Sequence, residues 1–127
     1  MILGIGIDNV DVERIQKKIS KNPDFLSYVF SSVEIEICNR KTKKYESFAA
    51  RFAAKEAFLK AIGTGIDLSI PLNQIVIHNQ SDGKPYIEIN DTIRMLFTNL
   101  FTFTPKVHIS MSHSSTEAFA FVIIESD

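Results

Sequence analysis

One segment organises this chain: Arg51-Phe52-Ala53-Ala54-Lys55-Glu56-Ala57-Phe58-Leu59-Lys60-Ala61. Its large apolar residues recur at near-helical spacing, and its alanines keep the helix slim, so that neighbouring elements can pack closely against it. We expect a long helix over residues 46–62, ended by Gly63. A helix that is apolar on nearly all sides is buried, and its few charged residues then need partners.

The segments before this helix predict one strand and several shorter helices. We expect a strand over residues 2–7, a helix from about Asp11 to Ile19, and a short helix near residues 25–30. A capping box, with Ser31 as N-cap and Glu34 three positions later, predicts a further helix from about 32 to 39.

The segments after the long helix predict most of the sheet. Gly63-Thr64-Gly65 starts a flexible connection, and the next strand is expected at residues 74–78. An Asp82-Gly83 turn leads into a strand at 85–89. A helix then covers 91–100, and strands follow at 107–112 and 118–124. The whole chain, residues 1–127, is expected to form one α+β domain with a mostly antiparallel sheet packed on a long central helix.

Composition restricts the function classes. The 127 residues are 45% hydrophobic and 23% charged, which is typical of one folded domain. The net charge of −1 gives no global attraction to nucleic acid or anionic membrane, and no apolar stretch approaches the roughly 20 residues that span a bilayer. The N-terminus does not resemble a signal peptide. The single cysteine, Cys38, excludes an intrachain disulfide and is interpreted as a buried thiol. We therefore expect a cytoplasmic protein that binds neither membrane nor nucleic acid.

Two carboxylates carry the functional signal. Asp8 ends the apolar run from Ile2 to Ile7, and Glu56 lies in the long helix with Lys60 one turn further on. Such a set could hold a hard metal ion and the phosphates it carries. Two plainer interpretations stay open: Glu56 and Lys60 as a surface ion pair, and Asp8 as a cap of the first helix, for which Asn9 and Asp11 compete. The apolar surroundings of Glu56 favour the metal and the phosphate.

Other residues carry weaker signals. Gly4 and Gly6 share the strand face of Asp8, and their bare surface admits either a ligand or a closely packed helix. His113 follows a predicted strand and could contact a phosphate or shuttle a proton, although a lone histidine is more often structural, as we expect for His78 and His108. The basic run at residues 40–44 is usually solvated surface; it fits a small polyanion such as a nucleotide phosphate better than nucleic acid. There is no zinc-site pattern, P-loop or dinucleotide motif.

Three segments, in this order, resemble the AcpS-type 4′-phosphopantetheinyl transferases, the holo-[acyl-carrier-protein] synthase family. The segments are Gly4-Ile5-Gly6-Ile7-Asp8-Asn9-Val10 with Arg14, then Arg51 to Ala61 with Gly63-Thr64-Gly65, and Val107-His108-Ile109-Ser110-Met111-Ser112-His113. The turn Gly83-Lys84-Pro85-Tyr86 also matches. The resemblance spans the chain. It departs at Asn9, at Ser114 and in the aromatic stretch from Phe97 to Thr104.

The resemblance implies a 4′-phosphopantetheinyl transferase-like fold and a reaction. Coenzyme A would donate its 4′-phosphopantetheine arm to a serine of apo-acyl carrier protein, release adenosine 3′,5′-bisphosphate and support fatty acid biosynthesis. By motif position Asp8 and Glu56 would bind Mg²⁺. Glu56, Lys60 and His113 would be catalytic, with Lys60 on the phosphates and Glu56 as the weakly favoured base for the serine. The family also implies a homotrimer with shared active sites.

The resemblance further implies two binding surfaces. Coenzyme A would lie around His113 and the turn of Asp82, Gly83 and Pro85, with Lys43, Lys44 and Arg51 near its 3′-phosphate. The first helix would dock the acidic carrier protein through Arg14, Lys17, Lys18 and Lys21; the alternative for these four residues is an ordinary solvated helix side.

Two other functions compete with the transferase. One is a metal-dependent phosphate enzyme such as a nucleotide pyrophosphatase, and the other is a non-catalytic module that binds coenzyme A or an acidic partner.

Overall fold

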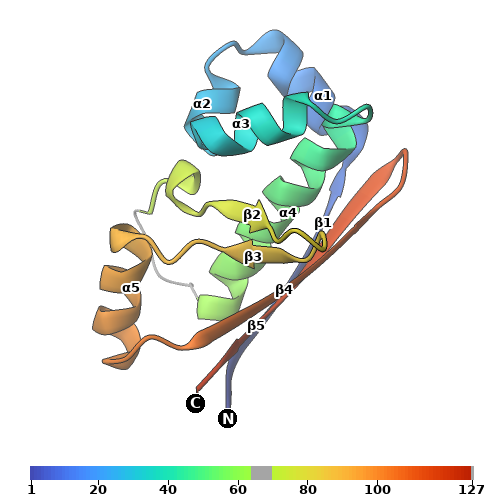
Figure 1. Ribbon diagram of the computed structural model, residues 1–127. Coiled ribbons are helices and arrows are strands. Elements are labelled where there is room, and N and C mark those ends of the chain that lie inside the picture. Colours follow the sequence, from blue (N-terminus) through green and yellow to red (C-terminus); the bar gives the residue numbers. More distant parts are fainter. Residues whose placement is uncertain (64–69, 127) are drawn as a thin grey trace.

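The computed structural model describes residues 1–63 and 70–126, so Thr64 and Gly65 of the expected flexible connection lie outside the described residues. Figure 1 shows the chain from blue at the N-terminus to red at the C-terminus. In chain order the elements are β1 (Ile2–Asp11), α1 (Val12–Lys21), α2 (Phe25–Val29), α3 (Ser32–Asn39), α4 (Lys44–Ile62), the 3₁₀ helix η1 (Leu72–Gln74), β2 (Ile77–Asn79), β3 (Pro85–Ile87), α5 (Asp91–Phe101), β4 (Lys106–His113) and β5 (Glu117–Glu125).

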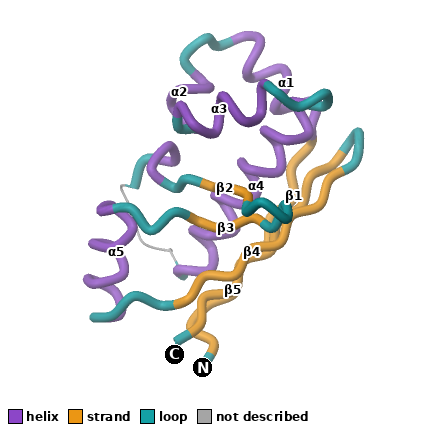
Figure 2. The backbone as a smooth tube through the Cα atoms, in the orientation of Figure 1, coloured by secondary structure: helices purple, strands orange, loops and turns teal. Residues whose placement is uncertain are grey.

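The strands form two antiparallel units around α4. One is a three-stranded sheet in the order β1-β5-β4, and the other is the β2–β3 hairpin. The helices α1, α2 and α3 gather at one end of α4, and α5 lies toward its other end (Figures 1 and 2). The expected α+β architecture, with an antiparallel sheet packed on a long central helix, is confirmed.

The glycines of β1 let the sheet lie directly on α4. A Cβ atom on Gly4 would lie 1.7 Å from the carbonyl oxygen of Ala61, and one on Gly6 would lie 1.8 Å from that of Ala57. The backbones of β1 and α4 are therefore in contact, and only glycine facing a small residue permits this approach. Of the two uses expected for these glycines, the structure shows close packing against a helix.

The other face of the sheet is apolar and exposed. Ile5 and Ile7 of β1 are 57% and 60% exposed, and Phe119 and Phe121 of β5 are 45% and 38% exposed. They are neighbours, because Ile7 pairs with Phe121 and Asn9 pairs with Phe119 across the two strands. This set of Ile5, Ile7, Phe119 and Phe121 is called the outer face below.

The boundaries of several elements are as expected. Ser31 and Glu34 form both bonds of the capping box that begins α3, and Gly63 ends α4 in the left-handed region with φ of 81°. Asp11 caps α1, since its side chain accepts from the backbone nitrogens of Glu13 and Arg14. This leaves Asp8 free of the capping role.

Two predictions of strand boundaries are wrong. Asp8 does not end β1, because pairing with β5 continues to Asp11 opposite Glu117. The strand predicted at 74–78 is replaced by η1 and the short β2. Within that stretch the carbonyl oxygen of Ile75 accepts a hydrogen bond from the buried Lys55 ammonium, as does that of Leu72 in η1. Among the described helices, none is both long and apolar enough to cross a bilayer.

Candidate active site

Asp8, Glu56 and Lys60 lie together where β1 crosses α4. The Lys60 ammonium lies 3.0 Å from Asp8 Oδ1 and donates a second bond of 3.0 Å to the carbonyl oxygen of Ile7. The Asp8 side chain is only 18% exposed, and Glu56 is half-buried. We call these three residues the carboxylate cluster.

The electrostatics of the carboxylate cluster favour a further cation. Burial raises the pKa of Glu56, the negative charge of Asp8 raises it further, and Lys60 opposes both. Two partly buried carboxylates therefore share one ammonium, which leaves negative charge uncompensated. Oxygen donors of this kind fit Mg²⁺, which typically takes one or two carboxylates and completes its shell with phosphate oxygens and water. Within residues 1–63 and 70–126 no group of three or more His, Cys, Asp or Glu side chains could hold a metal ion by itself.

A second group of predicted residues lines a pocket beside the hairpin. Lys43 precedes α4, Arg51 lies on α4, Gly83 and Pro85 come from the hairpin, and His113 ends β4. The remaining lining residues are Lys41, Thr42, Ser47, Ala50, Asn79 and Met111. The described lining contains four basic or imidazole side chains and no Asp or Glu, so we call it the basic pocket.

Arg51 is the most unusual residue of the basic pocket. It is only 3% exposed. Its Nη1 donates to Ser47 Oγ at 3.0 Å and its Nη2 to Asn79 Oδ1, whereas its buried Nε has no hydrogen-bond partner in the described part of the chain. A buried guanidinium with an unused donor can receive an anion. His113 is held beside it by a 2.8 Å contact between its Nδ1 and Glu46 Oε1.

Two residues expected near coenzyme A do not line the basic pocket. The Lys44 ammonium lies 5.2 Å from the centre of the Tyr45 ring, and Lys44 lines a different pocket. Asp82 accepts a bond from the Lys84 backbone nitrogen at 2.9 Å and so stabilises the turn. His78 and His108 pair with Glu88 and Glu125 on the surface.

The carboxylate cluster and the basic pocket belong to opposite edges of the three-stranded sheet. Asp8 lies on β1 and His113 on β4, with β5 between them. Asp8, Glu56 and Lys60 are absent from the described lining of the basic pocket. The predicted site residues therefore form two groups within one chain rather than one.

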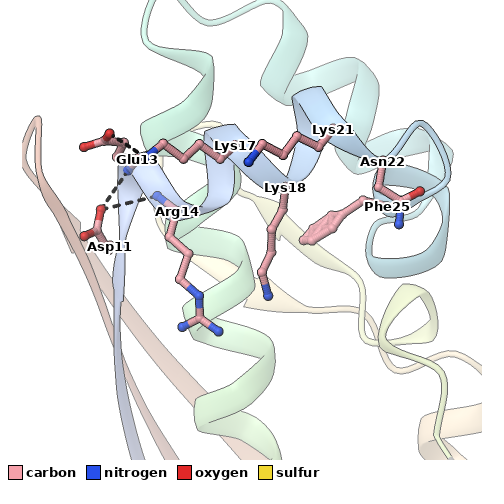
Figure 3. Close-up of a pocket in the computed structure, with 8 residues that line it drawn as sticks. All are labelled: Asp11, Glu13, Arg14, Lys17, Lys18, Lys21, Asn22 and Phe25. Atoms are coloured by element: carbon pink, nitrogen blue, oxygen red, sulfur yellow. Dashed lines mark hydrogen bonds and ion pairs between the residues drawn. The ribbon is translucent and has the colours of Figure 1, made fainter.

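A third group lies on α1, where Arg14, Lys17, Lys18 and Lys21 line one groove with Asp11, Glu13, Asn22 and Phe25. In Figure 3 the side chains of Arg14 and Lys18 extend side by side from the helix, and Lys18 lies next to Phe25. The Lys18 ammonium is 6.0 Å from the Phe25 ring centre, and Lys17 pairs with Glu13 at 3.1 Å. The structure thus brings all four predicted basic residues to one surface.

The sequence did not reveal several supporting residues. Glu34 was assigned only to the capping box, yet its Oε1 also lies 2.7 Å from the Lys55 ammonium and both side chains are fully buried. Burial lowers the pKa of Lys55, and Glu34 opposes that shift. The contacts of Asn79 and Glu46 join segments far apart in the chain and had no sequence signal. Cys38 is a buried thiol as predicted, and burial raises its pKa.

Comparison with known proteins places the chain in a family. The 4′-phosphopantetheinyl transferase superfamily matches residues 4–121. The holo-[acyl-carrier-protein] synthase of Cytophaga hutchinsonii is 51% identical over 123 residues, covering 97% of each chain. That of Syntrophus aciditrophicus is 42% identical over 127 residues, covering 98% of this chain and 97% of its own.

Solved structures of the same family share the fold. A synthase from Neisseria meningitidis superposes with a TM-score of 0.87 at 31% identity, covering 99% of this chain and 100% of its own. One from Bacillus anthracis, in complex with coenzyme A (3′,5′-ADP), has a TM-score of 0.80 at 34% identity, covering 100% and 99%. The chain belongs to the 4′-phosphopantetheinyl transferase superfamily and, within it, to the holo-[acyl-carrier-protein] synthases.

Proposed function

We propose that this enzyme transfers the 4′-phosphopantetheine group of coenzyme A to a serine of apo-acyl carrier protein, in the cytoplasm and in support of fatty acid biosynthesis. The observation that carries the proposal is the pair of oppositely charged groups on the two edges of the sheet. The carboxylate cluster fits a metal-bound pyrophosphate, and the basic pocket fits a further phosphate. Residues 1–127 act as one catalytic domain.

The carboxylate cluster would carry the chemistry. Asp8 and Glu56 would hold Mg²⁺, whose charge would neutralise the developing negative charge on the leaving phosphate. Lys60, paired with Asp8, would contact the same phosphates. The serine oxygen forms a bond to the phosphorus of the phosphopantetheine phosphate, and the bond from that phosphorus to the leaving phosphate of adenosine 3′,5′-bisphosphate breaks. Glu56, directly or through a metal-bound water, is our candidate for the group that takes the serine proton.

The other two surfaces would bind the substrates. The basic pocket would hold the 3′-phosphate end of coenzyme A through Lys43, Arg51 and His113, with Gly83 and Pro85 against the nucleoside. The basic groove on α1 would dock the acidic carrier protein, since complementary charge speeds the encounter of two proteins.

The arrangement of the two groups supports a homotrimer with shared active sites. The outer face exposes four large apolar side chains next to one another, and such patches favour association. A head-to-tail ring would place the β1 edge of one copy beside the β4 edge of the next. Each active site would then combine the carboxylate cluster of one copy with the basic pocket of its neighbour.

Intact-mass spectrometry of an apo-acyl carrier protein tests the proposal. Incubation with the enzyme, coenzyme A and Mg²⁺ should add the mass of one phosphopantetheine, and EDTA should abolish the gain. Cleavage of coenzyme A without a carrier adduct would indicate the pyrophosphatase instead. Intact coenzyme A and unchanged carriers, across a panel of acidic carrier proteins, would indicate the binding module.

A further inference from the structure

Three cations of α4 are held in different ways: the buried Arg51, the buried Lys55 and the exposed Lys60. The Lys55 ammonium is neutralised by Glu34 at 2.7 Å, and the Lys60 ammonium faces Asp8 at 3.0 Å. Among the described residues, the hydrogen-bond partners of Arg51, which is 3% exposed, are the hydroxyl of Ser47 and the side-chain amide of Asn79. Neutral acceptors orient the guanidinium without compensating its charge.

Asn79 is placed to do more than accept that bond. It ends β2, and its Nδ2 donates to the carbonyl oxygen of Gly83 at 2.9 Å. Gly83 has a φ of 91°, and its backbone nitrogen donates to the carbonyl oxygen of Gln80 at 2.8 Å, which closes the turn. The Asn79 amide therefore joins the buried guanidinium of α4 to the turn, whose Gly83 also lines the basic pocket.

We propose that Asn79 is a positioning residue that holds Arg51 toward the basic pocket with its charge uncompensated, so that the site selects donors carrying a phosphate monoester at the 3′ position. The inference rests on the proposed function and deepens it. A phosphate monoester carries nearly two negative charges and several acceptor oxygens, and Arg51 Nε, which has no partner within residues 1–63 and 70–126, offers a donor for one of them. Lys41 and Lys43 in the same lining add to the attraction.

The replacement of Asn79 by aspartate tests whether the uncompensated charge of Arg51 matters for the donor. Asn79→Asp keeps an acceptor for Arg51, removes the Nδ2 donor to Gly83 and adds a negative charge where the phosphate would bind. Asn79 is solvent-exposed, so the replacement removes no core packing. Asn90→Asp is the matched control, because Asn90 also bonds a backbone carbonyl, that of Gln74 at 2.8 Å, but lies outside the described lining of the basic pocket.

The experiment compares coenzyme A with 3′-dephospho-coenzyme A as donors, in steady-state transfer to apo-acyl carrier protein. Asn79→Asp should lower kcat/KM for coenzyme A by about tenfold or more, mainly through KM, because the added carboxylate would neutralise Arg51 and repel the phosphate, and a lost interaction between charged groups is of about that size. The value for 3′-dephospho-coenzyme A should stay within about threefold, so the preference for the phosphorylated donor collapses. Asn79→Ala should reduce the same preference, and Asn90→Asp should preserve it.

Equal losses with both donors would show that Asn79 only supports the fold, and an unchanged preference would also overturn the inference. A calorimetric titration with adenosine 3′,5′-bisphosphate separates this question from catalysis. Asn79→Asp should bind adenosine 3′,5′-bisphosphate more weakly than Asn90→Asp does, whether or not the wild-type chain transfers phosphopantetheine. A wild-type chain that transfers nothing would refute only the proposed function. Equal binding by the two variants would overturn the role of Asn79.

Discussion

At the scale of single residues, Glu56 combines a cost in stability with a proposed role in catalysis. Its pKa is raised by burial and by Asp8, so the folded protein binds a proton there more tightly than the unfolded chain. The free energy of unfolding therefore falls as the pH rises from the pKa of Glu56 in the unfolded chain to its raised pKa in the folded protein. Above that window the full cost of holding the Glu56 carboxylate charged remains. Functional sites commonly carry such penalties.

We predict that Glu56→Gln abolishes carrier modification and raises the stability of the metal-free protein. The gain in free energy of unfolding should be present at pH 8, where the wild-type Glu56 is charged and glutamine is not. It should disappear below the pKa of glutamate in the unfolded chain, where Glu56 is neutral too. Urea unfolding in EDTA at several pH values measures it. Glu36→Gln, at an exposed position paired with Arg40, is the control and should leave transfer unchanged. A folded Asp8→Ala, Glu56→Ala double variant with near-normal activity would refute the metal assignment.

At the scale of elements, the buried pair of Lys55 and Glu34 ties four segments together. Lys55 lies on α4, Glu34 on α3, and the Lys55 ammonium also donates to the carbonyl oxygens of Leu72 at 2.9 Å and Ile75 at 2.6 Å. Glu34 Oε2 accepts from the Ile77 backbone nitrogen at 3.0 Å, at the start of β2. The pair thus fixes α3 and the hairpin against the helix that bears the site residues.

We predict that Lys55→Met lowers the free energy of unfolding by about 3–5 kcal/mol, because it leaves the Glu34 carboxylate buried without its counterion. Adding Glu34→Gln should recover part of that loss. Lys17→Met, which breaks an exposed pair with Glu13, should change stability by less than about 1 kcal/mol. Urea denaturation of the wild type, Lys55→Met, Glu34→Gln and the double variant provides the double-mutant cycle, and a harmless Lys55→Met would contradict the structural role.

The basic groove of α1 leads to a separate prediction about the carrier protein. Reversing a charge there should slow the encounter with an acidic partner but leave the small donor unaffected. Arg14→Glu should therefore raise KM for acyl carrier protein more than KM for coenzyme A, and the difference should shrink as salt is added. The same reversal at Arg94 on α5, away from the groove, is the control. Equal effects of Arg14→Glu on both substrates would contradict docking at α1.

Local signals predicted the elements well, and contacts between distant segments could not be predicted. The capping box of Ser31 and Glu34 and the left-handed Gly63 are rules of a few neighbouring residues, and both are observed. Of the strand expected at 74–78 only its end lies in β2 (Ile77–Asn79), and the Ile75 carbonyl oxygen accepts a hydrogen bond from the Lys55 ammonium. Periodicity cannot show which buried charge meets which backbone group, so the Glu34–Lys55 pair was not expected.

The candidate site was predicted in parts. Residue types and motif positions indicated Asp8, Glu56 and Lys60, which the structure brings together. They did not indicate that Lys44 and Asp82 would lie outside the described lining of the basic pocket. The direction of the Lys44 side chain, at the start of α4, depends on neighbours such as Tyr45 that no short motif specifies.

At the scale of the whole molecule, the outer face should hold copies of the chain together. We predict a trimer for the wild-type protein in sedimentation velocity, and a single folded chain for the Ile7→Lys, Phe121→Asp double variant. Both replaced residues are exposed, so the replacement should not disturb the core. The separated chains should have lost transfer activity, since each would lack its neighbour's half of the site. A wild-type monomer with full activity would contradict the shared site.

The most direct test of the account is complementation between two inactive variants. One carries Asp8→Asn and Glu56→Gln in the carboxylate cluster, and the other carries Lys43→Ala and His113→Ala in the basic pocket. Each should be nearly inactive alone. If each site combines the cluster of one copy with the pocket of the next, co-expressed mixed trimers should recover about a quarter of wild-type carrier modification, because random assembly pairs an intact cluster with an intact pocket at that frequency. No recovery in trimers shown to contain both variants would contradict a site built from two copies.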